Sequence, residues 1–265
     1  MNDDCMNENI LQSFDGPIDV MVQGASRGIG AAFVRALAAS PTVRRIVATS
    51  RDPDASEALA DLRRDIGERL LAVPLDVTRE ATIEAAADSV SDRVETLSLI
   101  VNCAGLLHDG EAMQPERRLA EVSPAALQRS FEVNAWGPLL VAKHFARLLP
   151  RRERAVFASL SARVGSIGDN RLGGWYAYRA AKAAQNMFTK GLAIELPRRH
   201  RGTLVVALHP GTVDTDLSAP FQSRVPDEQL FDAGRAAGQL LAVIDGLGRD
   251  DNGGFFAWDG QPIPW

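Results

Sequence analysis

Two residues of this chain, Tyr178 and Lys182, have the types and the spacing of a proton-transfer pair. They stand four residues apart in a helical stretch, so their side chains share one face of a helix. A phenol ordinarily ionises near pH ~10, and a neighbouring ammonium group stabilises the phenolate and lowers that pKa. The pair therefore predicts a tyrosine that acts as a general acid or base close to neutral pH.

The alternative interpretation of this pair is an amphipathic helix that packs a tyrosine and exposes a lysine. Lysine is rare in this chain, where Lys143, Lys182 and Lys190 stand against a large excess of arginine. A lysine at this particular position is therefore less easily explained by chance. Tyr176 is six residues from Lys182 and off its face, so the spacing favours Tyr178 as the reacting phenol.

A glycine-rich segment directly follows a strand predicted at residues 18–23. It reads Gln23-Gly24-Ala25-Ser26-Arg27-Gly28-Ile29-Gly30. Glycine permits a tight turn and lets the backbone approach a pyrophosphate closely. The helix that follows offers unpaired N–H groups and the positive end of its dipole to phosphates. The position between the first strand and first helix predicts a dinucleotide site, and the alternative is a helix start that binds no ligand.

The end of the second predicted strand distinguishes the two nicotinamide cofactors. An NAD site usually places an acidic side chain there, to accept the ribose 2′-hydroxyl. This strand ends with Ser50 at that position, followed by Arg51, whose guanidinium suits a 2′-phosphate. Arg27 could join it from the glycine segment. The sequence therefore predicts NADP(H), a preference that would weaken if Asp52 pointed into the site.

Apolar runs and helical patterns alternate along the chain and must position these residues. Strands are predicted at residues 18–23, 45–49, 70–75, 97–103, 155–159, 203–208 and 254–258, and helices at 28–40, 55–64, 79–90, 124–149, 177–196 and 233–245. The strands are continuously apolar, which is expected when helices cover both faces of a sheet. Repeated β-α-β units predict an α/β fold with a doubly wound parallel sheet of about seven strands. We expect a flexible leader over residues 1–16 and a single domain over residues 17–265.

Two irregular stretches, residues 106–121 and 210–226, follow the fourth and sixth predicted strands. Open α/β sheets bind ligands at the carboxyl ends of their strands, so both stretches are expected at the substrate, with residues 216–231 closing the pocket. Five of their side chains are apolar: Leu107, Met113, Leu217, Phe221 and Val225. They indicate a hydrophobic aldehyde or ketone, unless they only pack the loops onto the body.

Composition excludes several other classes of function. The net charge of −5 argues against nucleic-acid binding, and no apolar stretch reaches the ~18 residues of a membrane span. Cys5 and Cys103 make neither a disulfide framework nor a metal site, and the histidines lack ligand spacing. We expect a cytoplasmic protein without a metal ion.

An ordered set of motifs over residues 17–265 resembles the short-chain dehydrogenase/reductase family, which implies a Rossmann-like fold. The glycine segment is similar to the family's T-G-x-x-x-G-I-G, with Gln23 for the threonine, and Tyr178-Arg179-Ala180-Ala181-Lys182 is its Y-x-x-x-K. The other matching segments are Asp76-Val77, Asn102-Cys103-Ala104-Gly105, Asn134 and Pro210-Gly211-Thr212-Val213-Asp214-Thr215. The resemblance implies that Asp76 and Val77 contact the adenine, and that the segment from Pro210 closes over the nicotinamide.

The same resemblance implies roles around the reacting centre. Lys182 would hold the nicotinamide ribose, and Asn134 would hold a water that relays protons from it; the alternative for Asn134 is a side chain that stabilises a helix kink. The family's active-site serine, counted back three residues from Gly165, falls on Ala162. We predict that the adjacent Ser161 reaches the substrate oxygen instead. Otherwise Tyr178 alone would hold that oxygen.

A narrower resemblance links residues 165–178 and the segment 258–265 to the C-factor and sniffer-type carbonyl reductases. The sequence therefore predicts NADPH-dependent hydride transfer between the nicotinamide and a carbonyl or alcohol carbon. The alternatives are an NADPH-binding signalling or scaffold module with little turnover, and a lyase or epimerase that uses the same tyrosine. The helices at residues 124–149 and 177–196 pair subunits in many relatives, which suggests a homodimer or homotetramer.

Overall fold

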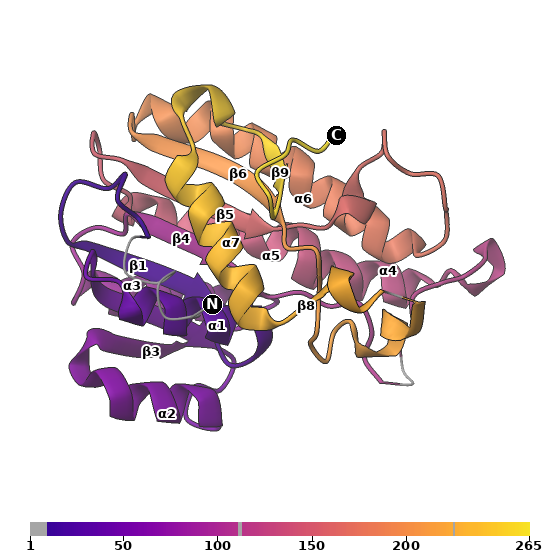
Figure 1. The fold of residues 1–265 in the computed structure, drawn as a ribbon, viewed down its shortest axis with the longest axis horizontal. Helices are drawn as coiled ribbons and strands as arrows, with labels where there is room; N and C mark the ends of the chain where they lie inside the picture. The colour runs from indigo at the N-terminus through magenta and orange to yellow at the C-terminus, as the bar shows by residue number, and fades with distance from the viewer. Residues whose placement is uncertain (1–9, 111–112, 225) are drawn as a thin grey trace.

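The computed structural model describes residues 10–110, 113–224 and 226–265, and it is built around one parallel sheet. The seven strands lie in the order β3-β2-β1-β4-β5-β6-β9 (Figure 1), and each neighbouring pair is parallel. They are β1 (Ile18–Gln23), β2 (Val43–Ser50), β3 (Leu70–Pro74), β4 (Leu99–Asn102), β5 (Ala155–Leu160), β6 (Thr203–His209) and β9 (Phe255–Ala257). The predicted fold class is confirmed.

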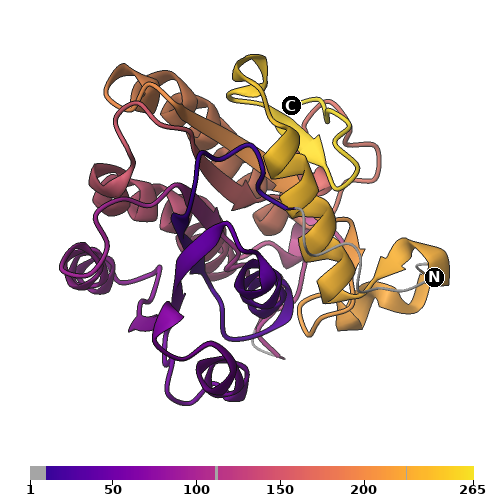
Figure 2. The same ribbon diagram turned by 60° about the vertical axis from the view of Figure 1, so that its left-hand side comes forward.

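Helices cover both faces of this sheet (Figure 2). The helices α1 (Gly28–Ala39), α2 (Glu57–Ile66) and α7 (Ala233–Gly246) share one apolar cluster with the sheet. The helices α3 (Glu80–Ser91), α5 (Gly137–Phe145) and α6 (Tyr176–Glu195) share the other. Side chains alternate between faces along each strand, so Val20 and Val22 enter the first cluster while Met21 enters the second. This double burial explains the continuously apolar strands.

The strand order reverses at β1, which lies between β2 and β4. Chain connections therefore leave β1 and β4 in opposite directions, and a crevice opens at their carboxyl ends. The glycine segment follows β1 at this point, and residues 103–105 follow β4. The predicted cofactor segments are thus neighbours across the switch in strand order.

The long helix predicted at residues 124–149 consists of four segments. α4 (Pro124–Phe131) passes into a π-helical turn (Glu132–Trp136), then α5, then a 3-10 turn (Ala146–Leu148). Pro138 explains the interruption, because it has no N–H to bond the carbonyl of Asn134 four residues earlier. A π-helical turn in such a position often marks a functional site.

The second half of the predicted flexible leader is part of the core, which corrects that prediction. Ile10, Leu11 and Phe14 are buried in the cluster that contains α7. The carboxylate of Asp245 accepts hydrogen bonds from the amides of residues 12 and 13, at 3.1 and 2.8 Å. The Arg154 guanidinium lies 5.2 Å from the centre of the Phe14 ring. The rest of the leader, residues 1–9, lies outside the described residues.

Two short strands that the sequence did not predict bracket the segment after β6. β7 (Thr212–Val213) pairs in parallel with β8 (Leu230–Phe231). Between them, residues 219–224 form a 3-10 turn (Ala219–Arg224). Within the described residues, no helix is both long and apolar enough to cross a membrane.

Candidate active site

Tyr178 and Lys182 lie side by side in the first turns of α6, as predicted. Both side chains are buried, with 8% and 3% of their surfaces exposed. The Lys182 Nζ lies 5.8 Å from the centre of the Tyr178 ring. It donates hydrogen bonds to the carbonyl of Leu160, at the carboxyl end of β5, and to Oε1 of Gln185, at 2.7 and 2.9 Å. The lysine is therefore fixed at the strand end beneath the tyrosine.

Burial changes the acidity of both groups, in a way that spacing alone did not predict. It lowers the pKa of Lys182 to about 7, because the site stabilises the ammonium less well than water does. It raises the pKa of Tyr178, opposite to the predicted direction. The phenol is therefore protonated at neutral pH, which suits a group that donates a proton rather than one that removes it.

Asn134 occupies the π-helical turn and ties it to the loop after β4. Its amide nitrogen donates to the carbonyl of Leu106 at 2.7 Å, and its oxygen accepts from the Leu106 amide at 2.9 Å. A further bond joins the amide nitrogen to the Ser130 hydroxyl at 3.2 Å. The side chain is thus committed to positioning the start of the loop at residues 106–121.

Ser161 does not take the role predicted for it. Its hydroxyl is buried and donates to Oδ1 of Asn186 at 2.6 Å. A hydroxyl has a single proton to donate, so it has none left for a substrate oxygen. Ala162, which follows it, has no polar side chain. The described residues thus offer no serine hydroxyl at the family's usual position.

Glu116 contributes to the site from the loop after β4, and the sequence did not single it out. Its carboxylate is buried and accepts a hydrogen bond from the Ala177 amide in the first turn of α6, at 3.2 Å. An acidic group at this end of a helix is favourable electrostatically. The sequence signal was weak, because a glutamate in a polar loop is usually exposed.

The glycine segment fits a dinucleotide cradle. Gly24 has φ +82°, and a Cβ there would lie 2.7 Å from the Ala104 amide nitrogen. A Cβ at Gly30 would lie 2.1 Å from the carbonyl oxygen of Gly24. No described side chain caps the N-terminus of α1, so its first N–H groups face the crevice with their dipole available to phosphates.

The end of β2 agrees with the predicted cofactor preference. Ser50 is buried, and its hydroxyl has no hydrogen-bond partner among the described residues. Asp52 accepts a hydrogen bond from the Ala55 amide at 3.1 Å, so its carboxylate is occupied by the chain that follows. The positive charge of Arg51 contributes to lowering the pKa of Asp76. An exposed ion pair of 2.9 Å joins Arg27 to Asp216 across the crevice.

The remaining cofactor segments lie around the same crevice. Burial works to raise the pKa of Asp76, but hydrogen bonds from the amide and hydroxyl of Thr78 outweigh it and lower the pKa. Gln23, which replaces the family threonine, accepts from the Ala104 amide at 3.2 Å and so joins β1 to the segment after β4. The Asn102 side chain donates to the Ser159 hydroxyl at 3.2 Å.

The segment after β6 lies over the glycine segment. A Cβ on Gly28 would meet the methyl group of Thr215 at 3.3 Å. Gly211, with φ +79°, packs so closely that a Cβ would lie 2.7 Å from the Phe231 ring. This placement agrees with the closing role implied for the segment from Pro210.

Of the apolar loop residues predicted at the substrate, the described contacts place Leu217 beside Asn134. Leu107 and Met113 are buried, and a Cβ on Gly105 would lie 3.5 Å both from Leu217 and from the Asn134 oxygen. Val225 lies outside the described residues. Among those described, no group of three or more His, Cys, Asp or Glu side chains is arranged to hold a metal ion.

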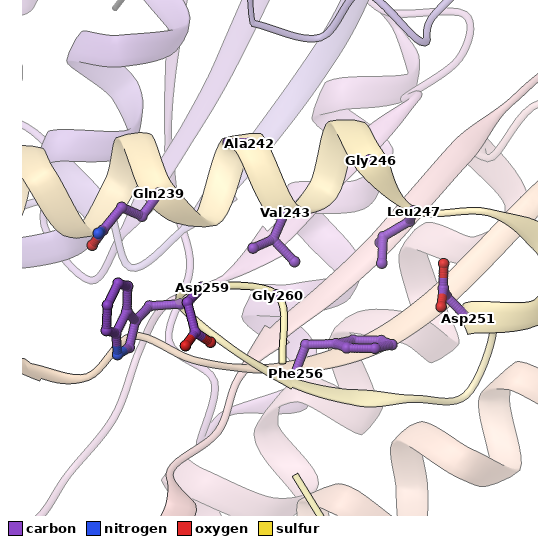
Figure 3. A pocket seen from close by; sticks show the side chains of 10 residues that line it. Gln239, Ala242, Val243, Gly246, Leu247, Asp251, Phe256, Asp259 and Gly260 are labelled. Atoms are coloured by element: carbon purple, nitrogen blue, oxygen red, sulfur yellow. The ribbon is translucent and has the colours of Figure 1, made fainter. Parts of the chain in front are cut away.

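A separate hollow of about 470 Å³ lies between α7 and the chain around β9 (Figure 3). Figure 3 shows Val243 of α7 pointing toward the chain that carries Phe256 and Gly260, with Gln239 at one end of the hollow. It is lined by none of the predicted site residues. The hollow is therefore separate from the predicted site beside α6.

Comparisons with known proteins give one consistent set of similarities. Residues 19–226 match the family model described as short chain dehydrogenase. The C-signal of Myxococcus xanthus is 36% identical over 147 residues, which cover 56% of this chain and 83% of that protein. The NADPH-bound carbonyl reductase from chicken fatty liver is 29% identical with a TM-score of 0.82, over 96% of this chain and 97% of that one. The carbonyl reductase Sniffer of D. melanogaster is 26% identical with a TM-score of 0.82, over 94% and 100%.

Proposed function

This chain belongs to the short-chain dehydrogenase family, and we propose that it is an NADPH-dependent reductase of aldehydes or ketones in which Tyr178 supplies the proton. The family match and the two carbonyl reductase structures confirm the predicted resemblance. The observation that carries the proposal is the buried contact of Tyr178 with Lys182 at the strand ends. Burying a lysine costs free energy even when it is hydrogen-bonded, and titratable groups perturbed by burial gather at functional sites.

The reaction needs one hydride and one proton. NADPH, when bound, supplies the hydride to the carbonyl carbon. The Tyr178 hydroxyl donates its proton to the carbonyl oxygen, so a ketone or aldehyde becomes an alcohol and a phenolate remains. The Lys182 ammonium stabilises that phenolate until it regains a proton. Asn134 positions the start of the loop at residues 106–121, and its side-chain oxygen keeps one lone pair with which we propose that it holds a water.

NADPH rather than NADH is supported by the residues at the end of β2. Arg51 follows Ser50 there, and Asp52 is bonded to its own chain. Arg27 lies at the surface on the other side, where its only described ion pair is with Asp216. We propose that a 2′-phosphate accepts charge-assisted hydrogen bonds from these two guanidinium groups. The chicken enzyme, whose structure holds NADPH, is consistent with this choice.

A second function is favoured by one specific observation. Ser161 is bonded to Asn186 and Ala162 stands at the usual serine position, so the substrate oxygen is polarised less than in a site with that serine. This arrangement, with the similarity to C-signal, supports an NADPH-binding signalling module with little turnover. The two functions differ in one measurement, which is steady consumption of NADPH.

The test follows NADPH absorbance in the presence of a panel of aldehydes and ketones. We expect steady consumption that Tyr178→Phe reduces by about 10²–10⁴-fold, because the proton donor is lost. Tyr176→Phe is the matched control on the same helix, and it should keep the wild-type rate. Tight NADPH binding without consumption would favour the signalling module. An unaffected Tyr178→Phe variant would refute the assigned role of the phenol.

We also propose that the chain forms a homodimer through α6. Tyr176, Met187 and Ile194 are 40%, 70% and 59% exposed, and their spacing places them on one face of the helix. An apolar face of this kind is typical of a subunit contact. Light scattering on the purified protein tests it, and a monomer would contradict it.

A further inference from the structure

Four rings of the described residues form a continuous row that ends at the catalytic tyrosine. We call His108, Phe221, Trp175 and Tyr178 the aromatic row. Successive ring centres are 6.0, 5.1 and 6.4 Å apart, and each pair meets edge to face. The rings come from three separate segments: the loop after β4, the segment after β6, and the start of α6. The row therefore joins all the elements expected at the substrate.

Trp175 is held in this row by an unusual backbone conformation. Its φ is +50°, and Leu11 is the only other described non-glycine residue with a positive φ. A left-handed conformation is unfavourable for a residue with a side chain, because its Cβ approaches the following carbonyl oxygen. Such strain persists only where the surroundings fix it, and it gathers at functional sites.

The surroundings of Trp175 do fix it. Its amide donates to the Glu116 carbonyl at 2.5 Å. The Arg179 guanidinium donates to the carbonyls of Gly173 and Gly174, at 3.2 and 3.1 Å, and to that of Val164 at 3.2 Å. The backbone that carries the indole is thus anchored both to the loop after β4 and to the chain after β5, by groups that do not depend on a substrate.

Phe221 is held much more weakly. It lies in the 3-10 turn after β6, where its amide bonds the Ser218 carbonyl of the same segment at 2.8 Å. Two described polar contacts join that segment to the rest of the protein, and both involve Asp216. Its carbonyl oxygen lies within hydrogen-bond distance of the His108 ring, and its carboxylate pairs with Arg27. Both contacts are exposed, and exposed contacts of this kind contribute little. Of the two rings, Phe221 therefore stands on the less firmly fixed backbone.

We propose that Trp175 is a specificity-determining residue, and that an aromatic ring of the carbonyl substrate replaces the Phe221 ring against it. The substrate class is then aryl aldehydes and aryl ketones. The Phe221 ring shows where the aromatic ring of the substrate would lie. It packs edge to face on Trp175, and Trp175 in turn packs on Tyr178. This inference rests on the proposed carbonyl reduction, and it adds what the substrate carries beside its carbonyl group.

The test compares acetophenone with cyclohexyl methyl ketone, two methyl ketones that carry a six-membered ring. The intrinsic reactivities differ, so the quantity to follow is how each variant changes the ratio of the two kcat/KM values. Trp175→Leu should lower the aryl-to-cyclohexyl ratio by about three- to tenfold, since the aromatic pairing is lost. Trp175→Phe should restore most of the ratio. Trp265→Leu, at the far end of the chain, should leave it unchanged.

A second variant, Phe221→Leu, tests whether the Phe221 ring competes with the substrate for Trp175. Removing the ring that competes with substrate should lower KM for acetophenone and keep the aryl preference. If Trp175→Leu changes kcat/KM for both ketones equally, the tryptophan is only structural and the inference is overturned.

Failure of the proposed function has a different signature, which is no consumption of NADPH with any carbonyl compound. Calorimetry with each ketone on the NADPH-loaded protein still decides the inference in that case. Tighter binding of acetophenone that Trp175→Leu abolishes would support it. Equal affinities for the two ketones in the wild-type protein would overturn it.

Discussion

The two sides of the reaction site are built differently. On one side, Tyr178, Lys182 and the glycine segment stand on α6, β5 and the β1–α1 turn, where regular elements fix their positions. On the other, the described parts of residues 106–121 and 210–231 reach the site as irregular chain with short bridges. The regular side is specified by periodic patterns, whereas the irregular side is specified by contacts between distant residues. The proton-transfer chemistry therefore resides on the first side, and the proposed selectivity arises where the two sides meet, with Trp175 at the start of α6 and Phe221 in the second.

The strongest test of that division removes the cation from the regular side. Lys182→Met should lower kcat/KM by about 10²–10⁴-fold for every carbonyl substrate, because no ammonium then stabilises the phenolate. The aryl-to-cyclohexyl ratio should stay as in the wild type, since Trp175 is untouched. If Lys182→Met changed the aryl-to-cyclohexyl ratio but kept most of the wild-type kcat/KM, the proposed division between chemistry and selectivity would be wrong.

The same lysine predicts the pH dependence of the wild-type reaction. Burial lowers the pKa of Lys182 to about 7, so its ammonium is present below that pH and is lost above it. Burial raises the pKa of Tyr178, so the phenol keeps its proton throughout this range. The kcat/KM for reduction should therefore fall as pH rises through about 7. Lys182→Arg, whose guanidinium stays charged, should move that fall to higher pH, and an unmoved profile would assign it to another group.

A smaller effect is expected at the end of β2, on the regular side, where we propose that the protein distinguishes NADPH from NADH. Arg51→Ala should reduce the preference for NADPH over NADH by roughly ten- to hundredfold, the value of one charge-assisted hydrogen-bonding group. Kinetics with both cofactors measure it. Asp52→Ala is the neighbouring control, and its preference should not change, because the Asp52 carboxylate is bonded to the Ala55 amide.

The smallest effect is expected at the boundary between the two sides. Ser161→Ala should change kcat less than twofold, because its hydroxyl serves Asn186 rather than the substrate. It should lower the free energy of unfolding by ~1–3 kcal/mol, since the buried Asn186 oxygen loses its partner. Ala162→Ser should instead raise kcat if this position faces the substrate oxygen. Chemical denaturation and steady-state kinetics separate the two results.

Long apolar runs made the regular side predictable. The seven strands and the large helices were placed within a few residues, and the side-by-side arrangement of Tyr178 and Lys182 followed from spacing alone. The strands β7 and β8 were not predicted, because two residues give no periodic signal. The π-helical turn at Asn134 could have been inferred from Pro138, four residues later.

The sequence was least informative where burial or a distant partner decides the outcome. The predicted pKa direction for Tyr178 was wrong because spacing shows the neighbouring charge but not the loss of water. Ser161 was adjacent to the right position, yet its hydroxyl donates its hydrogen bond to Asn186, from another element. Glu116 and Trp175 acquire their roles only when the loop after β4 meets α6.

The docked segment ahead of β1 bears on how the protein should be produced. The family match begins at residue 19, and a shortened version cut at that boundary would lose Ile10, Leu11 and Phe14. These side chains cover α7 beside the strands, and each buried one contributes on the order of 1.5–3 kcal/mol. A shortened protein would thus expose the apolar surface of α7 that these side chains cover, and it would tend to aggregate. Affinity handles are better attached at Met1 with the native segment kept whole.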